Sequence, residues 1–486
     1  MTMQIAATPR RRQRRAQWAW LLSLTLASLL AACSTGSPPA TTAPTAPRTT
    51  SSGAAQTAVP NPTTAATPLG ANATATRTGI ATVAPPGNVT PRATQAATAT
   101  RGVATSAAGT PAPASAGPPQ QQTIRVPTKQ GQAEPTQERT ITLPAGFQIS
   151  VYAAGLGQAR LMIWSPEGAL VVSEQGTTNG RVSILTDRDG NGTSDERITF
   201  AQGLRNPHGL AFRDGYLYVA AENQVVRYRW QGGAAAQGNP EVVIPSLPTG
   251  GHATRTIGYG PDGRLYLAVG SSCNVCTEQD GRRAAIYQYN ADGSGGRLYA
   301  RGLRNAVGFV WQPGTGALWA TNNGRDGLGD DTPPETINLV RDGADFGWPY
   351  CHSGRIPDPQ FGRQGSCDNT AKPSFELQAH SAPLGLAFYP GQNTGQTFPA
   401  AYSGDLFVAF HGSWNRSTPT GYKIVRARFQ NGQPTGQTED FATGWLPDDS
   451  RSSWGRPVDV SVGPTGSLYV TDDALGVIYR ISYAGR

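Results

Sequence analysis

One short sequence pattern recurs six times between residues 165 and 471: a tight turn that contains glycine, then a strand of alternating aliphatic and aromatic residues. The turn glycines are Gly168, Gly215, Gly263, Gly316, Gly404 and Gly466. Their separations of 47, 48, 53, 88 and 62 residues are close to the length of a four-stranded blade, with the excess expected as loop insertions. We therefore expect residues 140–486 to form an all-β fold, a six-bladed β-propeller of four-stranded antiparallel blades. The first strand, near residues 141–153, is expected to pair with residues 477–481 and close the ring.

The N-terminal segment has the pattern of an export signal. Five arginines between residues 10 and 15 precede an uncharged apolar run over residues 18–32, which is too short to span a bilayer comfortably. The run ends in Leu30-Ala-Ala-Cys33, which resembles the lipobox of bacterial lipoproteins, where the cysteine is acylated. We predict a lipoprotein signal peptide at residues 1–32, a lipid on Cys33 and an extracytoplasmic protein anchored to the inner or outer membrane. A soluble secreted protein that is cut nearby is the alternative.

Residues 33–139 are predicted to be a disordered Thr/Ala/Pro-rich linker. No aromatic residue occurs between residues 34 and 121, so this stretch has too little apolar surface to offset the entropy of ordering. The formal net charge of the chain is +8. Because residues 1–140 hold 12 of the 40 basic but only 2 of the 32 acidic residues, the rest of the chain has 28 basic against 30 acidic residues. The basic charge therefore gives no reason to expect nucleic-acid binding.

Five motifs in the C-terminal part occur in the order found in one known family. They span residues 251–266, 302–308, 346–349, 411–416 and 455–460. As a set they resemble the glucose/sorbosone dehydrogenases, which are six-bladed propellers that use pyrroloquinoline quinone (PQQ) and calcium. The resemblance covers about residues 140–486. It implies a PQQ- and calcium-dependent sugar dehydrogenase that oxidises an aldose or an aldehyde sugar such as sorbosone.

The resemblance also implies roles for individual residues. His252 occupies the position of the base that removes the hydroxyl proton of the sugar while hydride passes to the quinone, a task that suits imidazole. Because PQQ carries several carboxylates, cations are expected around it. The residues that match the cofactor-binding positions are Arg304, Asn305, Arg416 and Arg456. For the arginines, surface charge or pairing between blades is the alternative.

Two loops are candidates for calcium, which prefers hard oxygen ligands. In the first loop the resemblance points to the backbone carbonyls of Gly324 and Arg325, and the loop adds the carboxylates of Asp326, Asp330, Asp331 and Glu335. The second loop offers oxygens at Asp187, Asp189, Asn191 and Asp195, and has Ile198 where an EF-hand has its final glutamate. The alternatives are an exposed acidic loop in the first case and a plain turn rich in Asp and Gly in the second.

Four cysteines lie beyond Cys33, and export favours disulfides. We expect Cys273 to pair with Cys276 and Cys351 to pair with Cys367; other pairings, or a zinc site made by all four, are the alternatives. Thr277 follows Cys276, so the haem-attachment motif is missing at this point. Electrons are therefore expected to leave to a separate acceptor, a quinone or a cytochrome.

Two positions depart from the soluble glucose dehydrogenases beside the expected active site. This chain has Val307 where those enzymes have an amide, and Ser271 where they have an acidic residue. The departures suggest a different substrate pocket, closer to the sorbosone branch, or a site that has lost oxidation. Two other functions stay open: a non-catalytic propeller that binds carbohydrate or protein at the cell surface, and a calcium-dependent hydrolase of the lactonase type.

Overall fold

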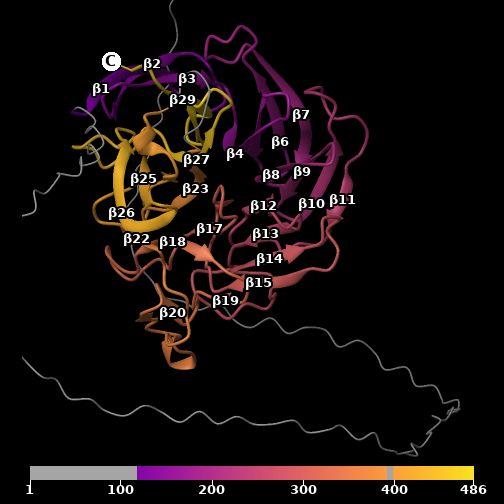
Figure 1. Ribbon diagram of the computed structural model, residues 1–486, viewed down its shortest axis with the longest axis vertical. Coiled ribbons are helices and arrows are strands. Elements are labelled where there is room, and N and C mark those ends of the chain that lie inside the picture. The colour runs from indigo at the N-terminus through magenta and orange to yellow at the C-terminus, as the bar shows by residue number, and fades with distance from the viewer. Residues whose placement is uncertain (1–117, 391–397, 486) are drawn as a thin grey trace, which may run out of the picture. The chain divides into compact units, whose positions relative to one another are not determined.

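The computed structural model describes residues 118–390 and 398–485. The predicted signal peptide at residues 1–32, the predicted lipid on Cys33 and the predicted linker up to residue 117 lie outside the described residues. The regular secondary structure of the described residues is almost entirely β-strand, with six main sheets arranged around a common centre (Figure 1). The predicted six-bladed propeller is confirmed. Across the two described ranges, no helix is long and apolar enough to cross a membrane.

The first three blades follow one another along the chain, and each begins with the strand nearest the centre (Figure 1). Blade one contains β4 (Gln158–Trp164), β5 (Leu170–Gln175), β6 (Gly180–Thr186) and β7 (Glu196–Leu204). Blade two contains β8 (Gly209–Arg213), β9 (Tyr216–Ala221), β10 (Gln224–Arg229) and β11 (Glu241–Ile244). Blade three contains β12 (Arg255–Tyr259), β13 (Leu265–Val269), β14 (Ala285–Tyr289), β15 (Arg297–Arg301) and the short parallel strand β19 (Ala344–Asp345).

The next two blades carry the insertions that lengthen the repeat spacing. Blade four contains β16 (Phe309–Trp311), β17 (Leu318–Asn322), β18 (Glu335–Val340) and β22 (Phe375–Leu377). Between its last two strands, besides β19, lie β20 (Cys351–His352), β21 (Ile356–Pro357) and the 3-10 turn η1 (Gly362–Gln364). Blade five contains β23 (Pro383–Phe388), the turn η2 (Ala400–Tyr402), β24 (Leu406–Phe410), β25 (Lys423–Gln430) and β26 (Gln433–Ala442).

Blade six joins the two ends of the folded chain. It contains β27 (Pro457–Val462), β28 (Leu468–Asp472), β29 (Val477–Tyr483) and, as its outer strand, β3 (Phe147–Ala153). In this antiparallel pairing Phe147 lies opposite Tyr483, and Ala153 lies opposite Ile478. The predicted ring closure between an N-terminal and a C-terminal strand is therefore confirmed. One sheet made from both ends of the domain removes the open edge that an unclosed ring would leave.

A β-hairpin precedes the propeller and corrects the predicted end of the linker. It consists of β1 (Gln120–Pro127) and β2 (Thr136–Leu143). Ile124, Val126 and Ile141 are buried in the same apolar cluster as Phe147, and the side chain of Gln122 donates to the backbone oxygen of Phe147 at 2.5 Å. The boundary predicted after residue 139 is therefore wrong. The composition of this segment is mostly polar, but a few apolar residues pack the hairpin against the propeller.

The recurrent glycines stand at the turn that leads into the second strand of each blade, before β5, β9, β13, β17, β24 and β28. All six have a positive φ, between 68° and 89°. Residues with a side chain rarely adopt this left-handed backbone conformation, whereas glycine adopts it without steric cost. The sequence repeat therefore marks the same turn in every blade.

Hydroxyl groups bind neighbouring blades together near the propeller axis. At four junctions, a hydroxyl of one blade donates to a backbone oxygen at or just before the innermost strand of the next blade. The pairs are Ser173 with His208, Thr256 with Val307, Thr321 with Leu384, and Thr471 with Arg160. Three of the acceptor residues also line the central pocket. These bonds between blades therefore hold the backbone of the pocket lining in place.

Candidate active site

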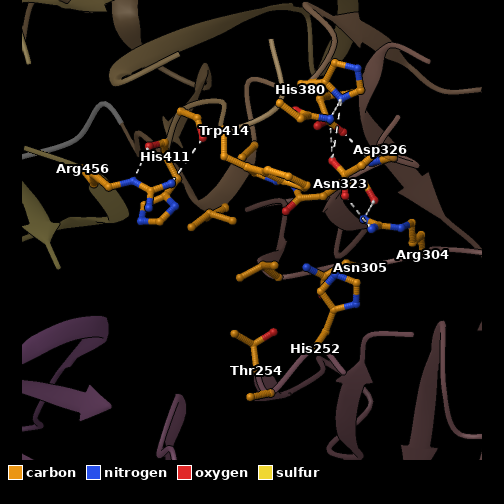
Figure 2. Close-up of a pocket in the computed structure, with 18 of the residues that line it drawn as sticks. His252, Thr254, Arg304, Asn305, Asn323, Asp326, His380, His411, Trp414 and Arg456 are labelled. Atoms are coloured by element: carbon orange, nitrogen blue, oxygen red, sulfur yellow. Dashed lines mark hydrogen bonds and ion pairs between the residues drawn. The ribbon is translucent and has the colours of Figure 1, made fainter. Parts of the chain in front are cut away.

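A pocket of about 230 Å³ lies where the innermost strands begin. Five blades contribute to its wall through Arg160 of β4, Thr254 before β12, Val307 before β16, Leu384 of β23 and Arg456 before β27. Figure 2 shows side chains from these separate blades converging on one space. A concave site with a few convergent polar groups at the axis of a ring is the expected place for a small ligand.

His252 is held at this pocket through one of its two ring nitrogens, Nδ1. Its Nδ1 lies 2.9 Å from the backbone oxygen of Ser271 and 3.1 Å from the Ser271 hydroxyl. That hydroxyl donates its own proton to the backbone oxygen of Cys273 at 2.6 Å, so both groups facing Nδ1 are acceptors. In the neutral ring, the proton is therefore on Nδ1 and the lone pair is on Nε2. Both side-chain hydrogen bonds of His252 within the described chain are made at Nδ1, and none is made at Nε2.

The environment keeps His252 neutral. Burial and then the positive charge of Arg304 lower the pKa of His252 to about 4, because both disfavour an imidazolium ion. The ring therefore has an empty acceptor position at neutral pH. A group in this state is able to take a proton from a hydroxyl placed against Nε2.

Three arginines predicted to bind a cofactor occupy different positions. Arg304 is only 5% exposed and donates to Asp326 at 2.9 Å. Arg456 donates only to the backbone oxygens of His411 and Gly412, at 3.3 and 3.4 Å. No ion pair joins Arg456 to any carboxylate of the described residues, although it lines the pocket. It is therefore a cation that is free to meet an anionic ligand.

Arg416 does not line the pocket. It donates to the backbone oxygen of Asp330 and lies 3.3 Å from a carboxylate oxygen of Asp331. Asp330 in turn accepts from Ser417. Arg416 thus fastens the acidic loop to the loop after β24, and of the predicted cofactor-binding arginines it is the one that the fold directs away from the cavity.

The predicted calcium residues of the acidic loop divide into two groups. Gly324, Asp326 and Glu335 line the pocket, and the backbone nitrogen of Gly324 donates to Glu335 at 2.5 Å. Burial raises the pKa of Glu335 to about 7. The side chain of Arg325 binds Asp358, and calcium binding by its backbone carbonyl stays a prediction. The carboxylate of Asp330 accepts from Ser417 and that of Asp331 lies beside Arg416, and neither residue lines the pocket.

The second predicted calcium loop lies between β6 and β7, away from the residues that line the pocket. Carboxylate oxygens of Asp187, Asp189 and Asp195 all lie within 4.8 Å of one another. Asn191 belongs to the same turn and donates to Asp189 at 2.8 Å. The four residues are therefore together, as the spacing predicted, and calcium binding there stays a prediction.

Arg160 and His411, to which the sequence analysis gave no role, line the pocket together with Arg456. Asp473 accepts from Arg160 at 2.6 Å and lies 2.9 Å from Nε2 of His411. Arg160 and Asp473 are 313 residues apart and meet only because β4 and β28 belong to adjacent blades. The sequence signal that could have found them is their place in the repeat: Arg160 is near the start of an innermost strand, and Asp473 directly follows β28.

Both positions that depart from the soluble glucose dehydrogenases are at the site. Val307 is buried against Leu384 and Val458 and lines the pocket. Ser271 is the partner of His252 described above. The predicted disulfides Cys273–Cys276 and Cys351–Cys367 are both present, so the zinc alternative is excluded for these four cysteines.

Comparison with known proteins places the chain in a family. A family model described as TrAA12-like matches residues 141–484. The chain belongs to the TrAA12-like family. It is 30% identical to an uncharacterised protein of Borreliella burgdorferi over 71% of this chain and 91% of that one. It is 25% identical to a pyrroloquinoline quinone-dependent pyranose dehydrogenase of Coprinopsis cinerea over 69% of this chain, and spans 54% of that longer protein.

The fold of this TrAA12-like chain is also found among solved structures. The holo form of the PQQ domain of the Coprinopsis cinerea pyranose dehydrogenase aligns with a TM-score of 0.62 at 23% identity, over 74% of this chain and 98% of that domain.

An exposed tryptophan stands at the mouth of the TrAA12-like pocket. Trp414 lines the pocket and is 77% exposed, so an aromatic face is available beside the polar wall (Figure 2).

Proposed function

We propose that this chain is a PQQ- and calcium-dependent dehydrogenase that oxidises an aldose or an aldehyde sugar, with His252 as the base. The single observation that carries the proposal is the pairing, in one pocket, of a neutral His252 that has a vacant Nε2 with Arg456, which has no carboxylate partner among the described residues. The names of the relatives support the same chemistry.

The residues of the pocket fit an anionic, carbonyl-rich cofactor. Arg456 makes no direct ion pair with a carboxylate of the described residues, and the buried side-chain oxygen of Asn305 has no hydrogen-bond partner in the protein. A buried polar atom without a partner is costly, so a ligand that offers this oxygen a donor, such as an N–H group of the cofactor or a hydroxyl of the sugar, is favoured. Arg304 and Arg160 add positive charge on opposite walls, although each already pairs with an aspartate. Gly324, Asp326 and Glu335 offer the oxygen donors that calcium prefers.

Bound PQQ would supply the acceptor for the hydride of the sugar, and bound calcium would supply a Lewis acid beside it. The chain then has three tasks. Nε2 of His252 takes the proton of the sugar hydroxyl, while Ser271 holds the tautomer that leaves this lone pair available. Arg456 and Arg304 balance the negative charge of the cofactor. Trp414 provides an apolar face at the mouth for the carbon face of a sugar ring.

The test is reconstitution of the purified chain without residues 1–117. PQQ and calcium are added, and dye reduction is followed with a panel of aldoses and aldehyde sugars, alongside hydrolysis of lactones. We expect PQQ-dependent dye reduction with at least one sugar. PQQ binding without dye reduction would leave a binding propeller, lactone hydrolysis without PQQ would favour the hydrolase, and the absence of PQQ binding would refute the proposal.

We further propose that the chain is exported and held at a membrane through a lipid on Cys33, and that a separate quinone or cytochrome takes its electrons. Support comes from the sequence pattern before Cys33 and from the missing haem motif at Cys276. Mass spectrometry of the N-terminal peptide from membrane fractions tests the anchor. An acylated Cys33 is the expected result, and release of the protein into the soluble fraction by Cys33→Ser is the matched control. An uncut or unmodified peptide would contradict the anchor.

A further inference from the structure

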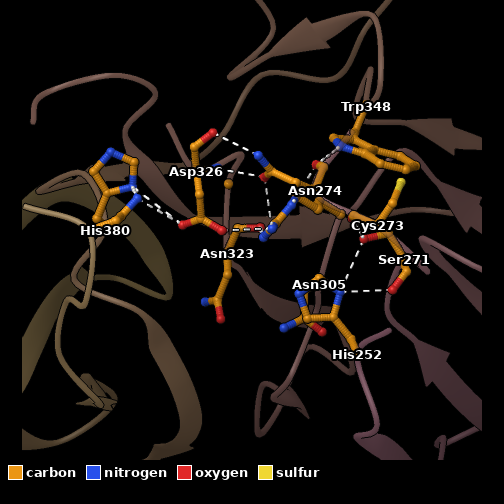
Figure 3. Close-up of polar contacts among 12 residues, drawn as sticks. His252, Ser271, Cys273, Asn274, Asn305, Asn323, Asp326, Trp348 and His380 are labelled. Atoms are coloured by element: carbon orange, nitrogen blue, oxygen red, sulfur yellow. Dashed lines mark hydrogen bonds and ion pairs between the residues drawn. The ribbon is translucent and has the colours of Figure 1, made fainter. Parts of the chain in front are cut away.

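A four-residue loop closed by the Cys273–Cys276 disulfide lies between β13 and β14, beside the pocket. Figure 3 shows that this loop contacts groups on two walls of the site. The residue at its tip is Asn274, which is itself exposed to solvent on its outer side. None of the roles derived above involves this residue.

Asn274 binds Arg304 with two of its oxygens. The Nε of Arg304 donates to the backbone oxygen of Asn274 at 3.0 Å, and Nη2 donates to the Asn274 side-chain oxygen, also at 3.0 Å. Nη2 further donates to Asp326 at 2.9 Å. The guanidinium plane is therefore fixed from two directions. A planar group with fixed donors loses little freedom when it binds a carboxylate.

The same side chain also binds the backbone of the acidic loop. The amide nitrogen of Asp326 donates to the Asn274 side-chain oxygen at 2.8 Å, and the Asn274 side-chain nitrogen donates to the backbone oxygen of Asp326 at 2.9 Å. This reciprocal pair resembles one step of a β-ladder, made by a side chain. It holds the segment that begins at Gly324, whose carbonyl and neighbouring carboxylates are the candidate calcium donors.

The base wall is tied to the same loop. The backbone oxygen of Cys273 accepts from the Ser271 hydroxyl at 2.6 Å, and that hydroxyl lies 3.1 Å from Nδ1 of His252. The ring nitrogen of Trp348 donates to the backbone oxygen of Asn274 at 3.3 Å and covers the loop from the other side. One short, cross-linked loop therefore contacts the support of the base, the buried arginine and the acidic loop.

We propose that Asn274, held by the Cys273–Cys276 disulfide, is a positioning residue that sets Arg304 and the Gly324–Asp326 segment for binding of the cofactor and its calcium. The inference rests on the proposed function, since it concerns the same pocket. The disulfide restricts the conformations open to a loop of four residues. Its removal therefore acts in the same direction as loss of the Asn274 side chain.

The principal variants are Asn274→Ala, which removes all three side-chain bonds, and Asn274→Asp, which keeps the oxygen that faces Arg304 and the amide of Asp326 but loses the donor. Because the residue is exposed, folding is expected to be preserved, and circular dichroism checks it. Asn290→Ala is the matched control: Asn290 also accepts from an arginine, Arg264, in a turn at the other end of blade three.

Calcium and PQQ affinities are measured by calorimetry and by the absorbance of bound PQQ. We expect Asn274→Ala to weaken calcium binding by about 10-fold to 100-fold, the range for a group that orients metal ligands, with PQQ binding weakened as well. Asn290→Ala should match the wild type in both affinities. A double variant, Cys273→Ala with Cys276→Ala, should resemble Asn274→Ala.

Hydrogen exchange of the Asp326 amide gives a readout that is independent of the cofactor. In the apo chain this amide should be protected in the wild type and in Asn274→Asp, which keeps the acceptor oxygen, and exposed in Asn274→Ala, which lacks it. Affinities within twofold of wild type in Asn274→Ala, or an Asp326 amide as protected in Asn274→Ala as in Asn274→Asp, would overturn the inference. If the wild type itself binds neither PQQ nor calcium, the proposed function fails, while the exchange result still decides whether Asn274 holds the loop.

Discussion

His252 donates its Nδ1 proton toward Ser271, whose hydroxyl lies 3.1 Å away and whose backbone oxygen lies 2.9 Å away. Both acceptors are uncharged. The base of this site is therefore oriented by neutral groups, and burial with Arg304 lowers its pKa to about 4. A carboxylate in place of Ser271 would give the same orientation with a different basicity.

Replacing Ser271 with aspartate tests this relationship. In Ser271→Asp the new carboxylate stabilises the imidazolium ion, so the pKa of His252 should rise from about 4 to roughly 5–7. The control Ser271→Ala removes the hydroxyl but keeps the backbone oxygen, and should leave the pKa low. NMR titration of the histidine resonances in the apo chain measures both. An unchanged pKa in Ser271→Asp would show that Ser271 does not govern the base.

The low pKa of His252 also predicts how stability depends on pH. The unfolded chain binds a proton on this residue below about 6.5, whereas the folded chain does so only below about 4. Unfolding free energy should therefore fall as the pH drops from 6.5 to 4, by up to about 3 kcal/mol from this group. Urea unfolding of wild type and His252→Gln across this window isolates the effect. Curves that stay parallel between pH 4 and 7 would contradict it.

Arg456 and Arg416 should respond differently to removal of their charge. Arg456 lines the pocket and makes no ion pair with a carboxylate of the described residues. Its removal in Arg456→Leu should therefore weaken PQQ binding by about 1.5–3 kcal/mol, the range for hydrogen bonds to charged groups. Arg416 contacts Asp330 and Asp331 outside the cavity, so Arg416→Leu should change PQQ affinity much less. Titration of both variants with PQQ decides. Equal losses of PQQ affinity in the two variants would show that Arg416 also binds the cofactor.

Calcium at the loop of Asp187, Asp189 and Asp195 should stabilise the propeller without affecting PQQ. Adding calcium to the apo chain should raise Tm because the ion binds only the folded loop, and Asp195→Asn should reduce this increase. Asp214→Asn, in an exposed turn after β8, serves as the matched control. If calcium raises Tm equally in all three proteins, the loop does not bind calcium and is a plain turn.

The sequence predicted the parts of this molecule that depend on local rules. The turn glycines marked the six blades because a left-handed backbone is a local requirement, and the motif set placed His252, Arg304, Asn305 and Arg456 at one pocket. Local composition failed where a few residues act through tertiary contacts. The hairpin β1–β2 is polar along most of its length, and it docks through a few buried apolar residues that include Ile124, Val126 and Ile141.

The rest of the site depends on contacts that no local pattern records. Arg160, His411 and Asp473 meet through the closure of the ring, with Arg160 and Asp473 at opposite ends of the folded chain. Arg416 carries the charge expected at a cofactor site, yet the fold directs it to the acidic loop. Asn274 is an exposed polar residue between two cysteines, and its proposed role follows from its contacts with Arg304 and with the backbone of Asp326.

The most direct measurement of the central claim is rapid mixing of the PQQ- and calcium-loaded protein with a sugar that reduces it, followed at the absorbance of the bound quinone. We predict that wild type reduces the quinone in a single turnover, and that His252→Ala binds PQQ with similar affinity but reduces it about 10²- to 10⁴-fold more slowly, the usual contribution of a general base. Reduction by His252→Ala at the wild-type rate would contradict the account.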